Sequence, residues 1–491
     1  MSASAYRAHV DPEKCVACGQ CAEVCPAGAA KLGQKLYTKD GPIVYPKQVL
    51  PDETKWGPEM WNENYRDDNP SANCYDTGTA PCKSNCPAHI AVQGYIRMAA
   101  EGRYMDALKL IKKENPFPTV CGHICNRRCE EACTRGDVDR AVAIDEIKKF
   151  VAEQELQADK RYIPKVITHR GIADPYPEKI AIIGAGPAGL SCAYYLANMG
   201  YENVTVFDKN EVPGGMLTLG IPSFRLEKDV VNAEIEVLRE MGVHFQCGVE
   251  IGKDLTIDQL REQGYKGFYL AIGAQKSAPI GVPGEDLSGV YGGVDFLRKV
   301  NLGKKPRIGK KCAVIGGGNV AMDVCRTAIR LGAKDTYIIY RRSQAEMPAD
   351  AEEVAEAMEE GVQFRFLSAP AEILGENGKV KALKVEIMEL GEPDESGRRS
   401  PVVKEGSDFE IPCDVVIMAL GTSPNPLLRK ATPDLEYSDR GGIVVQDDTV
   451  TTMKDGVFAG GDAVTGAATV IKAMGAGKKA AAAIDAYIRS K

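Results

Sequence analysis

The sequence has few histidines and no long apolar run. Its five histidines, at positions 9, 89, 123, 169 and 244, show no spacing typical of a metal site. No apolar stretch approaches the roughly 20 residues that a membrane-spanning helix needs. The first ten residues also lack the apolar segment of a secretory signal. We therefore expect a cytoplasmic protein without membrane insertion, in a compartment where thiols stay reduced.

The sequence also lacks an excess of basic residues. The chain has 491 residues, a formal net charge of -7, 44% hydrophobic residues and 26% charged residues. This composition is typical of a folded globular protein, and the length suffices for about three domains of roughly 150 residues each. The mildly acidic balance argues against nucleic-acid binding as the main function.

Cysteine is concentrated at one end of the chain. Eleven of the 16 cysteines lie in the first 133 residues. In a reducing compartment so dense a set indicates metal ligation rather than disulfides. The other five, at 192, 247, 312, 325 and 413, form no Cys-x-x-Cys pair. A disulfide-reductase active site is therefore not expected in the rest of the chain.

The first cysteine run has the spacing of bacterial ferredoxins. It reads Cys15-x2-Cys18-x2-Cys21-x3-Cys25-Pro26, the pattern that binds a [4Fe–4S] cluster. Zinc is the alternative, but zinc sites usually show two separated cysteine pairs. In two-cluster ferredoxins the fourth cysteine serves the other cluster, so Cys25 and the first three can belong to different clusters.

A glycine-rich turn follows the apolar strand 180–183 and opens a helix. It reads Gly184-Ala-Gly186-Pro187-Ala188-Gly189, and the next strand ends at Asp208, followed by Lys209. Such glycines let the backbone approach a pyrophosphate at the helix N-terminus, and an acid about 20 residues later suits a ribose hydroxyl. The pattern predicts a dinucleotide site.

A second strand, turn and helix of this kind begins at Cys312. Its turn reads Gly316-Gly-Gly318-Asn319-Val320-Ala321. Here the following strand ends in Arg341 and Arg342 instead of an acid. Two guanidiniums can bind a 2′-phosphate that a carboxylate would repel. We therefore predict NADPH over NADH at this site, with surface ion pairing of the two arginines as the alternative.

Three further segments resemble parts of flavin disulfide-reductase folds. Gly273 and Gly421 each follow a short apolar strand, like the crossovers between the two dinucleotide domains of those folds. Gly461-Asp462 resembles their second flavin fingerprint, whose aspartate binds the ribityl–phosphate part of FAD. A helix starting at Thr469-Val470 would direct its positive dipole end at the flavin. The resemblance assigns FAD to the first site and NADPH to the second.

The chain from Cys82 to its C-terminus resembles one oxidoreductase family. The family includes the small subunit of glutamate synthase, the N-terminal half of dihydropyrimidine dehydrogenase and the large subunit of bifurcating NADH-dependent ferredoxin:NADP oxidoreductase. The matching motifs are Cys82-x3-Cys86-Pro, Asn115-Pro-Phe-Pro-Thr-Val-Cys121-Gly, Cys129-Glu-Glu-Ala-Cys133, Gly214-Gly215-Met216-Leu, Gly220-Ile-Pro-Ser-Phe-Arg225-Leu and Tyr340-Arg-Arg. By this resemblance Arg225 lies near the flavin.

The resemblance also implies two [4Fe–4S] clusters held by interleaved cysteines. One cluster would take Cys82 and Cys133, and the other Cys86, Cys125 and Cys129. Cys121 is a further candidate ligand with an alternative structural role.

The sequence departs from the family pattern at two positions. Thr77 stands where the family has a cysteine, and Lys148 stands where some members have a glutamate or glutamine ligand. An ammonium cannot bind iron. Three clusters with four ligands each need twelve, and the cysteine-rich region has eleven cysteines. The count therefore stays open between two and three clusters, with Cys74 as the least secure ligand.

The expected fold is α/β, with two Rossmann-like dinucleotide domains in the disulfide-reductase arrangement. A small helical iron–sulfur domain and a short ferredoxin-like segment precede them. Within the helical domain we expect an amphipathic helix over 88–114 and another over 141–157. The expected divisions are a ferredoxin-like segment at 1–36, a connector at 37–73, an iron–sulfur domain at 74–170, an FAD domain at 171–300 and 415–491, and an NADPH domain at 301–414.

These parts together predict an NADPH-dependent oxidoreductase. A flavin between a nicotinamide site and a cluster chain links two-electron to one-electron transfer. No side chain need act as a catalytic nucleophile. The predicted FAD residues are Gly184, Gly186, Pro187, Ala188, Gly189, Asp208, Lys209, Gly215, Met216, Arg225, Gly273, Gly461, Asp462, Thr469 and Val470. The predicted NADPH residues are Gly316, Gly318, Asn319, Val320, Ala321, Arg341, Arg342 and Gly421.

The predicted partners are other redox subunits. We expect the chain to be a subunit of a complex that links NADP(H) to ferredoxin and to NAD or hydrogen. The expected partner is a flavin-containing, NAD-binding iron–sulfur subunit, and the complex is expected to be capable of flavin bifurcation. The alternative is the small subunit of an NADPH-dependent glutamate synthase, which would need a large glutaminase-bearing partner. A non-enzymatic scaffold is disfavoured because both nucleotide motifs are intact.

Overall fold

The computed structural model describes residues 37–38, 41–42, 80–137, 139–158, 161–164, 175–393, 399–446 and 449–491. The expected ferredoxin-like run at Cys15–Cys25, Cys74 and Thr77 therefore lie outside the described residues. The chain divides into two compact units. The first comprises residues 1–114 and 127–151, and the second comprises 115–126 and 152–491.

The first unit is mainly helical. Its helices are α4 (Pro81–Ser84), α5 (Val92–Ala100), α6 (Tyr104–Lys112), α8 (Arg128–Glu131), the 3-10 helix η1 (Thr134–Asp137) and the start of α9 (Ile144–Gln157). Two short strands, β1 (Tyr37–Thr38) and β2 (Gly41–Pro42), pair antiparallel.

The single helix expected over 88–114 is two helices in the structure. Gly102 takes a φ of +73° between α5 and α6. A left-handed residue cannot continue an α-helix, so the amphipathic pattern resumes in a second helix. The later helix, α9, lies close to its expected range.

The second unit contains two parallel sheets. The first sheet has the strand order β18-β6-β3-β4-β5. Its strands are β3 (Tyr176–Ile183), β4 (Tyr201–Asp208), β5 (His244–Cys247), β6 (Tyr265–Leu270) and β18 (Val457–Ala459). The strands that enter the core carry apolar runs, which is typical of a sheet covered on both faces.

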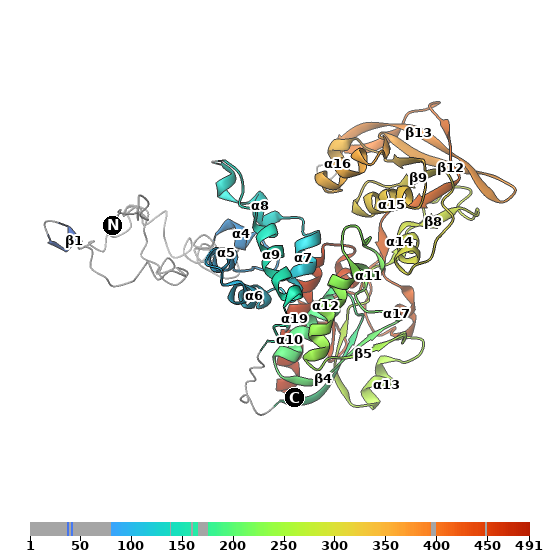
Figure 1. The fold of residues 1–491 in the computed structure, drawn as a ribbon. Helices are drawn as coiled ribbons and strands as arrows, with labels where there is room; N and C mark the ends of the chain where they lie inside the picture. The colour runs from blue at the N-terminus through green and yellow to red at the C-terminus, as the bar shows by residue number, and fades with distance from the viewer. Residues whose placement is uncertain are drawn as a thin grey trace, which may run out of the picture. The chain divides into compact units, whose positions relative to one another are not determined.

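Helices from distant parts of the chain lie around the first sheet, packed on its strands or on one another. They are α7 (Pro118–Ile124), α10 (Pro187–Asn198), α11 (Met216–Leu219), α12 (Lys228–Glu240), α13 (Ile257–Glu262), α17 (Pro426–Ala431), α18 (Asp462–Thr465) and α19 (Val470–Ser490). Helices α10 and α19 lie side by side (Figure 1), so closely that a Cβ on Gly477 would stand 2.2 Å from the carbonyl oxygen of Ala188.

The second parallel sheet has the strand order β11-β10-β9-β16-β8. Its strands are β8 (Val290–Gly292), β9 (Lys311–Ile315), β10 (Asp335–Ile339), β11 (Gln363–Arg365) and β16 (Val415–Met418). Its helical elements are α14 (Gly293–Asn301), α15 (Asn319–Arg330), the 3-10 helix η2 (Gln344–Glu346) and α16 (Ala351–Glu359).

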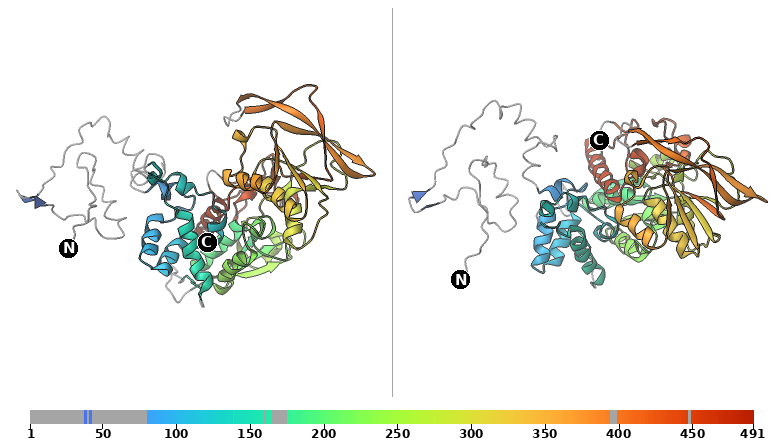
Figure 2. Two further views of the ribbon diagram at one scale, coloured as in Figure 1. Left: turned by 45° about the horizontal axis from the view of Figure 1, so that its top comes forward. Right: turned by 90° about the horizontal axis from the view of Figure 1, so that it is seen from above.

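An antiparallel sheet covers the other face of the second parallel sheet (Figure 2). It contains β12 (Ser368–Glu376), β13 (Lys379–Pro393), β14 (Arg399–Val403) and β15 (Phe409–Pro412). One apolar core joins the two sheets, with Ile315 and Val416 on one side and Leu383 and Ile411 on the other.

Sheet membership differs from the expected division at 300/301 and 414/415. Strands β8 and β16 both pair within the second sheet, and β16 lies parallel to β8 and β9. The chain passes between the two sheets at β7 (Lys276–Ser277) and β17 (Thr422–Ser423), which pair antiparallel. The second sheet therefore begins before residue 300 and ends after residue 414.

Candidate functional site

The first glycine turn connects β3 to α10 and has no room for a side chain at Gly184 or at Gly189. Gly184 takes a φ of +114°, and a Cβ there would stand 2.2 Å from the carbonyl oxygen of Ala271. A Cβ on Gly189 would stand 1.9 Å from the carbonyl oxygen of Gly184. Gly186 is the N-cap of α10. A helix start has backbone N–H groups without intrahelical partners, which suits a pyrophosphate.

Asp208 joins the end of β4 to the glycine turn. One carboxylate oxygen, Oδ2, accepts a hydrogen bond from the Ala185 N–H at 2.7 Å. The other, Oδ1, accepts bonds from the backbone and side-chain nitrogens of Asn210, each at 2.8 Å. A carboxylate offers about four lone-pair sites, so Asp208 keeps acceptor capacity for ribose hydroxyls.

A large cleft lies beside this turn. The space within it, part of which is open to solvent, is about 1370 Å³. The cleft brings together predicted residues from both sheets. From the first-sheet side it is lined by Gly184, Gly186, Pro187, Ala188, Asp208, Gly215, Met216, Arg225, Gly273, Asp462, Thr469 and Val470. From the second-sheet side it is lined by Asn319, Val320 and Asp323. Such a cleft fits an extended dinucleotide together with a second nucleotide.

Gly215 brings the second glycine pair to the first turn. Its φ is +54°, and a Cβ there would stand 2.7 Å from the Cα atom of Gly186. Helix α11 begins at the next residue, Met216. The two backbones thus form one wall of the cleft, and only glycine fits at the contact.

The C-terminal segment contributes a carboxylate and a helix start. Gly461 takes a φ of +64°, and Asp462 begins α18. Burial raises the pKa of Asp462 to about 6, against the opposing effect of a hydrogen bond from the Ala468 N–H. Thr469 is the N-cap of the 21-residue helix α19, whose N-terminus and its partial positive charge thus lie at the cleft.

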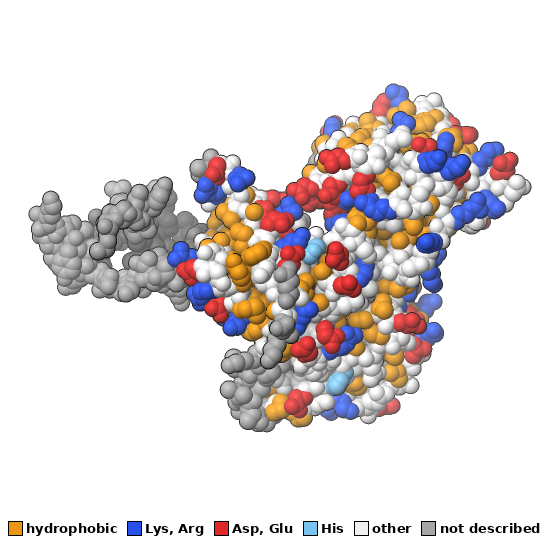
Figure 3. Space-filling model, viewed as in Figure 1, with side chains coloured by type: hydrophobic (Ala, Val, Ile, Leu, Met, Phe, Trp, Pro, Cys, Tyr) orange, Lys and Arg blue, Asp and Glu red, His pale blue; other side chains and the backbone are white. Residues whose placement is uncertain are grey.

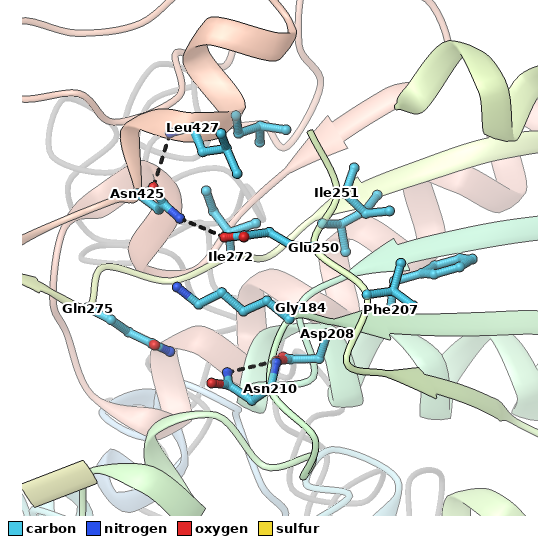
Figure 4. A pocket seen from close by; sticks show the side chains of 14 residues that line it. Gly184, Phe207, Asp208, Asn210, Glu250, Ile251, Ile272, Gln275, Asn425 and Leu427 are labelled. Atoms are coloured by element: carbon cyan, nitrogen blue, oxygen red, sulfur yellow. Dashed lines mark hydrogen bonds between the residues drawn. The ribbon is translucent and has the colours of Figure 1, made fainter. Parts of the chain in front are cut away.

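A smaller pocket of about 480 Å³ adjoins the cleft at Asp208 (Figure 4). It is lined by Lys209 and by polar side chains that the sequence did not single out, namely Asn210, Glu250, Gln275 and Asn425. The amide of Asn425 donates to Glu250 at 3.2 Å. These residues come from separate loops, so no local motif could have identified them.

The second glycine turn repeats the first in the second sheet. Gly316 takes a φ of +138°, and a Cβ there would stand 2.3 Å from the carbonyl oxygen of Ala419. Gly318 is the N-cap of α15, and Ala321 is fully buried. Asn319 Oδ1 accepts a hydrogen bond from the Asp350 N–H at 2.9 Å.

The two arginines after β10 differ in their surroundings. Arg342 is 8% exposed, and its Nε donates to the carbonyl oxygen of Arg399 at 2.7 Å. Arg341 is exposed. Within the described part of the chain it makes no hydrogen bond or ion pair. Arg341 is therefore the guanidinium that can receive an anion without losing an existing contact.

The residues that line the large cleft do not include the predicted Gly189, Lys209, Gly316, Gly318, Ala321, Arg341, Arg342, Gly421 and Gly461. Lys209 lines the smaller pocket. Gly421 precedes β17, whose Thr422 does line the cleft. Arg225 lines the cleft, but its guanidinium contacts Asp323 and Glu353 of the second-sheet side.

Four predicted cluster cysteines lie in the first unit, and they are Cys82, Cys86, Cys129 and Cys133. Burial, followed by the negative charge of Cys129, Asp145, Cys86 and Cys82, raises the pKa of Tyr95. Burial also raises the pKa of Cys82, to which Cys133 and Cys86 add. The Tyr95 hydroxyl donates to the Ile144 carbonyl at 3.0 Å.

Free thiols are the ligands that a [4Fe–4S] cluster takes. All the cysteines in the described ranges are free thiols. No three His, Cys, Asp or Glu side chains in those ranges form a group that could hold one metal ion. A [4Fe–4S] cluster needs ligands farther apart, because each cysteine binds a different iron.

Lys148 occupies a buried ion pair near these cysteines. Its ammonium donates to Asp145, and the two side chains are 6% and 2% exposed. Glu130 also holds the backbone of Asp145 in place, because its Oε1 accepts a hydrogen bond from the Asp145 N–H at 2.8 Å. The ammonium is thus committed to a carboxylate, as expected for a residue that cannot bind iron.

Cys121 and Cys125 belong to the second unit, on and at the end of α7. Cys121 is 2% exposed, and its Sγ lies 3.7 Å from both Asn115 Oδ1 and Met474 Sδ. Cys125 is the C-cap residue of α7. The contacts of Cys121 are those of a packed thiol.

No helix in the described ranges is long and apolar enough to cross a membrane.

Three family profiles match the chain. Residues 178–477 match the pyridine nucleotide-disulphide oxidoreductase family. Residues 61–160 match the 4Fe-4S cluster domain II of dihydropyrimidine dehydrogenase, and residues 8–31 match a 4Fe-4S binding domain. The iron–sulfur assignment of the cysteine-rich region is thereby confirmed over zinc.

Curated relatives are 36–43% identical to the chain. The beta subunit of NADP(+)-dependent formate dehydrogenase from Moorella thermoacetica is 43% identical, over 84% of this chain and 60% of that protein. The beta subunit of the NADPH-Fe(3+) oxidoreductase from Geobacter sulfurreducens is 38% identical, over 84% and 64%. The glutamate synthase [NADPH] small chain of Halomonas elongata is 38% identical, over 84% and 89%. The chain thus spans less than two thirds of the length of the first two relatives.

Solved structures share the fold. FprA from Mycobacterium tuberculosis aligns with a TM-score of 0.56 at 20% identity, over 64% of this chain and 85% of that one. Thioredoxin reductase from Lactococcus lactis aligns with a TM-score of 0.51 at 22% identity, over 64% and 100%. The predicted disulfide-reductase-like α/β fold is confirmed.

Proposed function

Since the chain belongs to the pyridine nucleotide-disulphide oxidoreductase family, in the branch of the glutamate synthase small chains, we propose that it is the NADPH-oxidising subunit of a larger redox complex. It is an oxidoreductase with FAD, NADP(H) and [4Fe–4S] clusters as cofactors. The observation that carries the proposal is the shared cleft, at which the helices after both glycine turns begin.

The residues around the cleft fit FAD on the first-sheet side. The start of α10 would hold the pyrophosphate, Asp208 the adenosine ribose, and Asp462 the ribityl–phosphate part. The N-terminus of α19 would favour negative charge on the flavin ring. When bound, FAD accepts a hydride and passes electrons on singly.

The second-sheet side fits NADPH. The start of α15 at Gly318 and Asn319 would hold the pyrophosphate. Arg341 would pair with the 2′-phosphate, and Arg342 would fix the loop through its bond to Arg399.

We assign the cluster ligands from the cysteine-rich region. Cys82, Cys86, Cys129 and Cys133 would bind two clusters together with Cys125, as the family pattern implies. Cys15, Cys18, Cys21 and Cys25 would bind a third cluster in the segment that matches a 4Fe-4S domain. Cluster ligation by so many thiolates requires a reducing compartment, so we propose a cytoplasmic location.

We propose a flavin- and iron–sulfur-containing, NAD-binding partner subunit, with ferredoxin as a further partner. Support comes from two relatives named as beta subunits, of which this chain matches only part. The cluster segment at 8–31 extends the electron path beyond what a flavin alone needs. More specifically, we propose that the complex carries out flavin bifurcation and transhydrogenation.

The alternative is the small chain of a glutamate synthase. It is favoured by a relative that this chain covers over 89% of its length. The ferredoxin-type segment favours the first proposal, because it supplies a cluster beyond the two that the family pattern implies.

Copurification distinguishes these two functions. The chain would be tagged at its own locus, purified without oxygen, and its partners identified by mass spectrometry. An NAD-binding flavoprotein partner supports the first proposal. A large glutaminase-bearing partner would overturn it in favour of glutamate synthase.

A further inference from the structure

Arg225 reaches from the first-sheet side of the cleft to two carboxylates on the other side. It lies between α11 and α12, and its Nη1 donates to Asp323 Oδ1 and Oδ2 at 2.8 and 3.0 Å. Its Nη2 donates to Glu353 Oε1. Asp323 lies on α15 and Glu353 on α16. One guanidinium therefore joins elements 98 and 128 residues away in the chain.

This ion-pair group is shielded from water. The side chains of Arg225, Asp323 and Glu353 are 16%, 7% and 12% exposed. A buried ion pair is favourable in few geometries, and a buried charge without a partner destabilises the fold. Removing the guanidinium would leave two buried carboxylates facing each other. The three side chains therefore stabilise one another only while the two sheets stay in this arrangement.

The loop around Arg225 makes further contacts across the cleft. The ring of Phe224 lies 4.8 Å from the Arg326 guanidinium and 3.9 Å from that of Arg330. The Asn301 amide donates to the carbonyl oxygens of Leu219, Gly220 and Ile221 at 3.0–3.2 Å. The loop is thus bound to α14 and α15 at several points, of which Arg225 is the charged one.

The electrostatics of α16 favour a cation at this point. Acidic side chains gather over this helix (Figure 3), and Glu352, Glu353, Glu356 and Glu359 lie along it. The Arg326 guanidinium forms ion pairs with Glu356 and Glu360 at 2.6 and 2.8 Å. Arg225 is the guanidinium that supplies the counter-charge from the first-sheet side.

The group also borders the place where the two nucleotides would meet. Arg225 and Met216 line the cleft on one side, and Asn319, Val320 and Asp323 line it on the other. A shift of the second sheet relative to the first would therefore change the distance between a nicotinamide and a flavin.

We propose that Arg225 is a positioning residue, which holds the nicotinamide-binding sheet against the flavin-binding sheet by gripping Asp323 and Glu353. Hydride transfer falls steeply when reacting atoms are misplaced by about 1 Å, so the grip sets the rate of transfer more than the affinity for NADPH. The kinetic part of this inference rests on the proposed function, whereas the structural part does not.

The test compares Arg225→Ala and Arg225→Lys with a control variant, Arg239→Ala. Arg239 lies on α12 in an exposed ion pair with Glu236. The lysine keeps the charge but loses the planar fork that contacts two carboxylates at once. Three quantities are measured on the full chain. They are the amide hydrogen exchange of 351–359 without nucleotide, the limiting rate of flavin reduction by NADPH in stopped flow, and the Kd for NADP⁺.

We expect faster exchange of 351–359 in both Arg225 variants and a tenfold or greater loss in limiting rate. The Kd for NADP⁺ should change less than threefold, and the control should match the wild type in all measurements. Unchanged hydrogen exchange of 351–359 would show that Arg225 does not hold the two sheets together, whatever the kinetics. A limiting rate of flavin reduction within twofold of the wild type would show that Arg225 plays no part in hydride transfer. An increase in Kd that matches the rate loss would make Arg225 a nucleotide-binding residue instead. A wild-type flavin that NADPH does not reduce would refute the proposed function, and the exchange measurement would still judge the grip.

Discussion

Glu234 Oε1 accepts a hydrogen bond from the backbone N–H of Thr119 at 2.8 Å, and its Oε2 accepts one from Val120 at 3.1 Å. The carboxylate is buried on α12, and the two N–H groups belong to the first turn of α7. Glu234 thus satisfies helix-start donors that α7 cannot satisfy itself. Through this contact the segment that carries Cys121 and Cys125 is fixed to α12, one of the helices around the first sheet.

Glu234→Gln should lower the thermal unfolding midpoint. Glutamine lacks the charge and can place only one oxygen at the two N–H groups, so the expected loss is about 2 kcal/mol. Glu236→Gln on the same helix removes an exposed partner of Arg239 and should change little. Equal midpoints for Glu234→Gln and the wild type in a melting experiment would show that the cap adds no stability.

Arg341→Ala should weaken NADPH binding by about 10- to 100-fold, the loss of a hydrogen-bonded ion pair with the 2′-phosphate. NADH binding should stay the same, because NADH has no phosphate there. Fluorescence titration with both nucleotides measures the ratio. Arg342→Ala should weaken both nucleotides alike, since Arg342 bonds to Arg399. A selective loss in Arg342→Ala with none in Arg341→Ala would exchange the two assignments.

Cys121→Ser should leave the iron and sulfide content unchanged. Its thiol is packed between Asn115 and Met474 in the folded chain. Cys125→Ser should lose about four irons, the content of one cluster. Chemical iron and sulfide analysis of both variants decides the matter. An equal loss of iron and sulfide in both variants would show that Cys121 is a cluster ligand.

Stability should respond to pH through Glu353. Burial raises its pKa to about 7, although Arg225 opposes the shift. A carboxyl with a raised pKa keeps its proton to a higher pH in the folded state than in the unfolded state. The contribution of Glu353 to stability is therefore lost as the pH rises from 4.5, its ordinary pKa, through about 7. Glu353→Gln should therefore reduce the difference in unfolding midpoint between pH 5.5 and pH 8, measured by melting. Glu359→Gln, an exposed change on the same helix, should keep the wild-type difference. The same reduction in both variants would refute a specific effect of Glu353.

The glycine turns could be predicted from sequence because their cause is local. Gly184 and Gly316 need positive φ angles and a missing Cβ at a close backbone contact, and few other motifs impose this spacing. The acids at 208 and 462 follow short strands in the same local pattern. Gly184, Asp208 and Asp462 line one cleft, and Gly316 stands three residues before Asn319, which lines it too.

Long-range pairings could not be read from the sequence in this way. The apolar segments 290–292 and 415–418 fit either parallel sheet, and only the register of Val415 with Cys312 and of Val416 with Val290 assigns them to the second. The same holds for side chains. Arg342 meets Arg399 of an antiparallel sheet, and Arg225 meets carboxylates far along the chain. Nothing near these arginines in sequence identifies such partners.

An anaerobic titration with NADPH tests the central claim most directly. The purified chain, with FAD and its clusters, is titrated while its visible absorbance and its low-temperature EPR spectrum are recorded. We expect NADPH to bleach the flavin absorbance and then to produce the EPR signals of reduced [4Fe–4S] clusters, and NADH to do so far less effectively. A flavin that stays oxidised with NADPH, or clusters that stay EPR-silent while the flavin is fully bleached, would contradict an electron path from NADPH through FAD to the clusters.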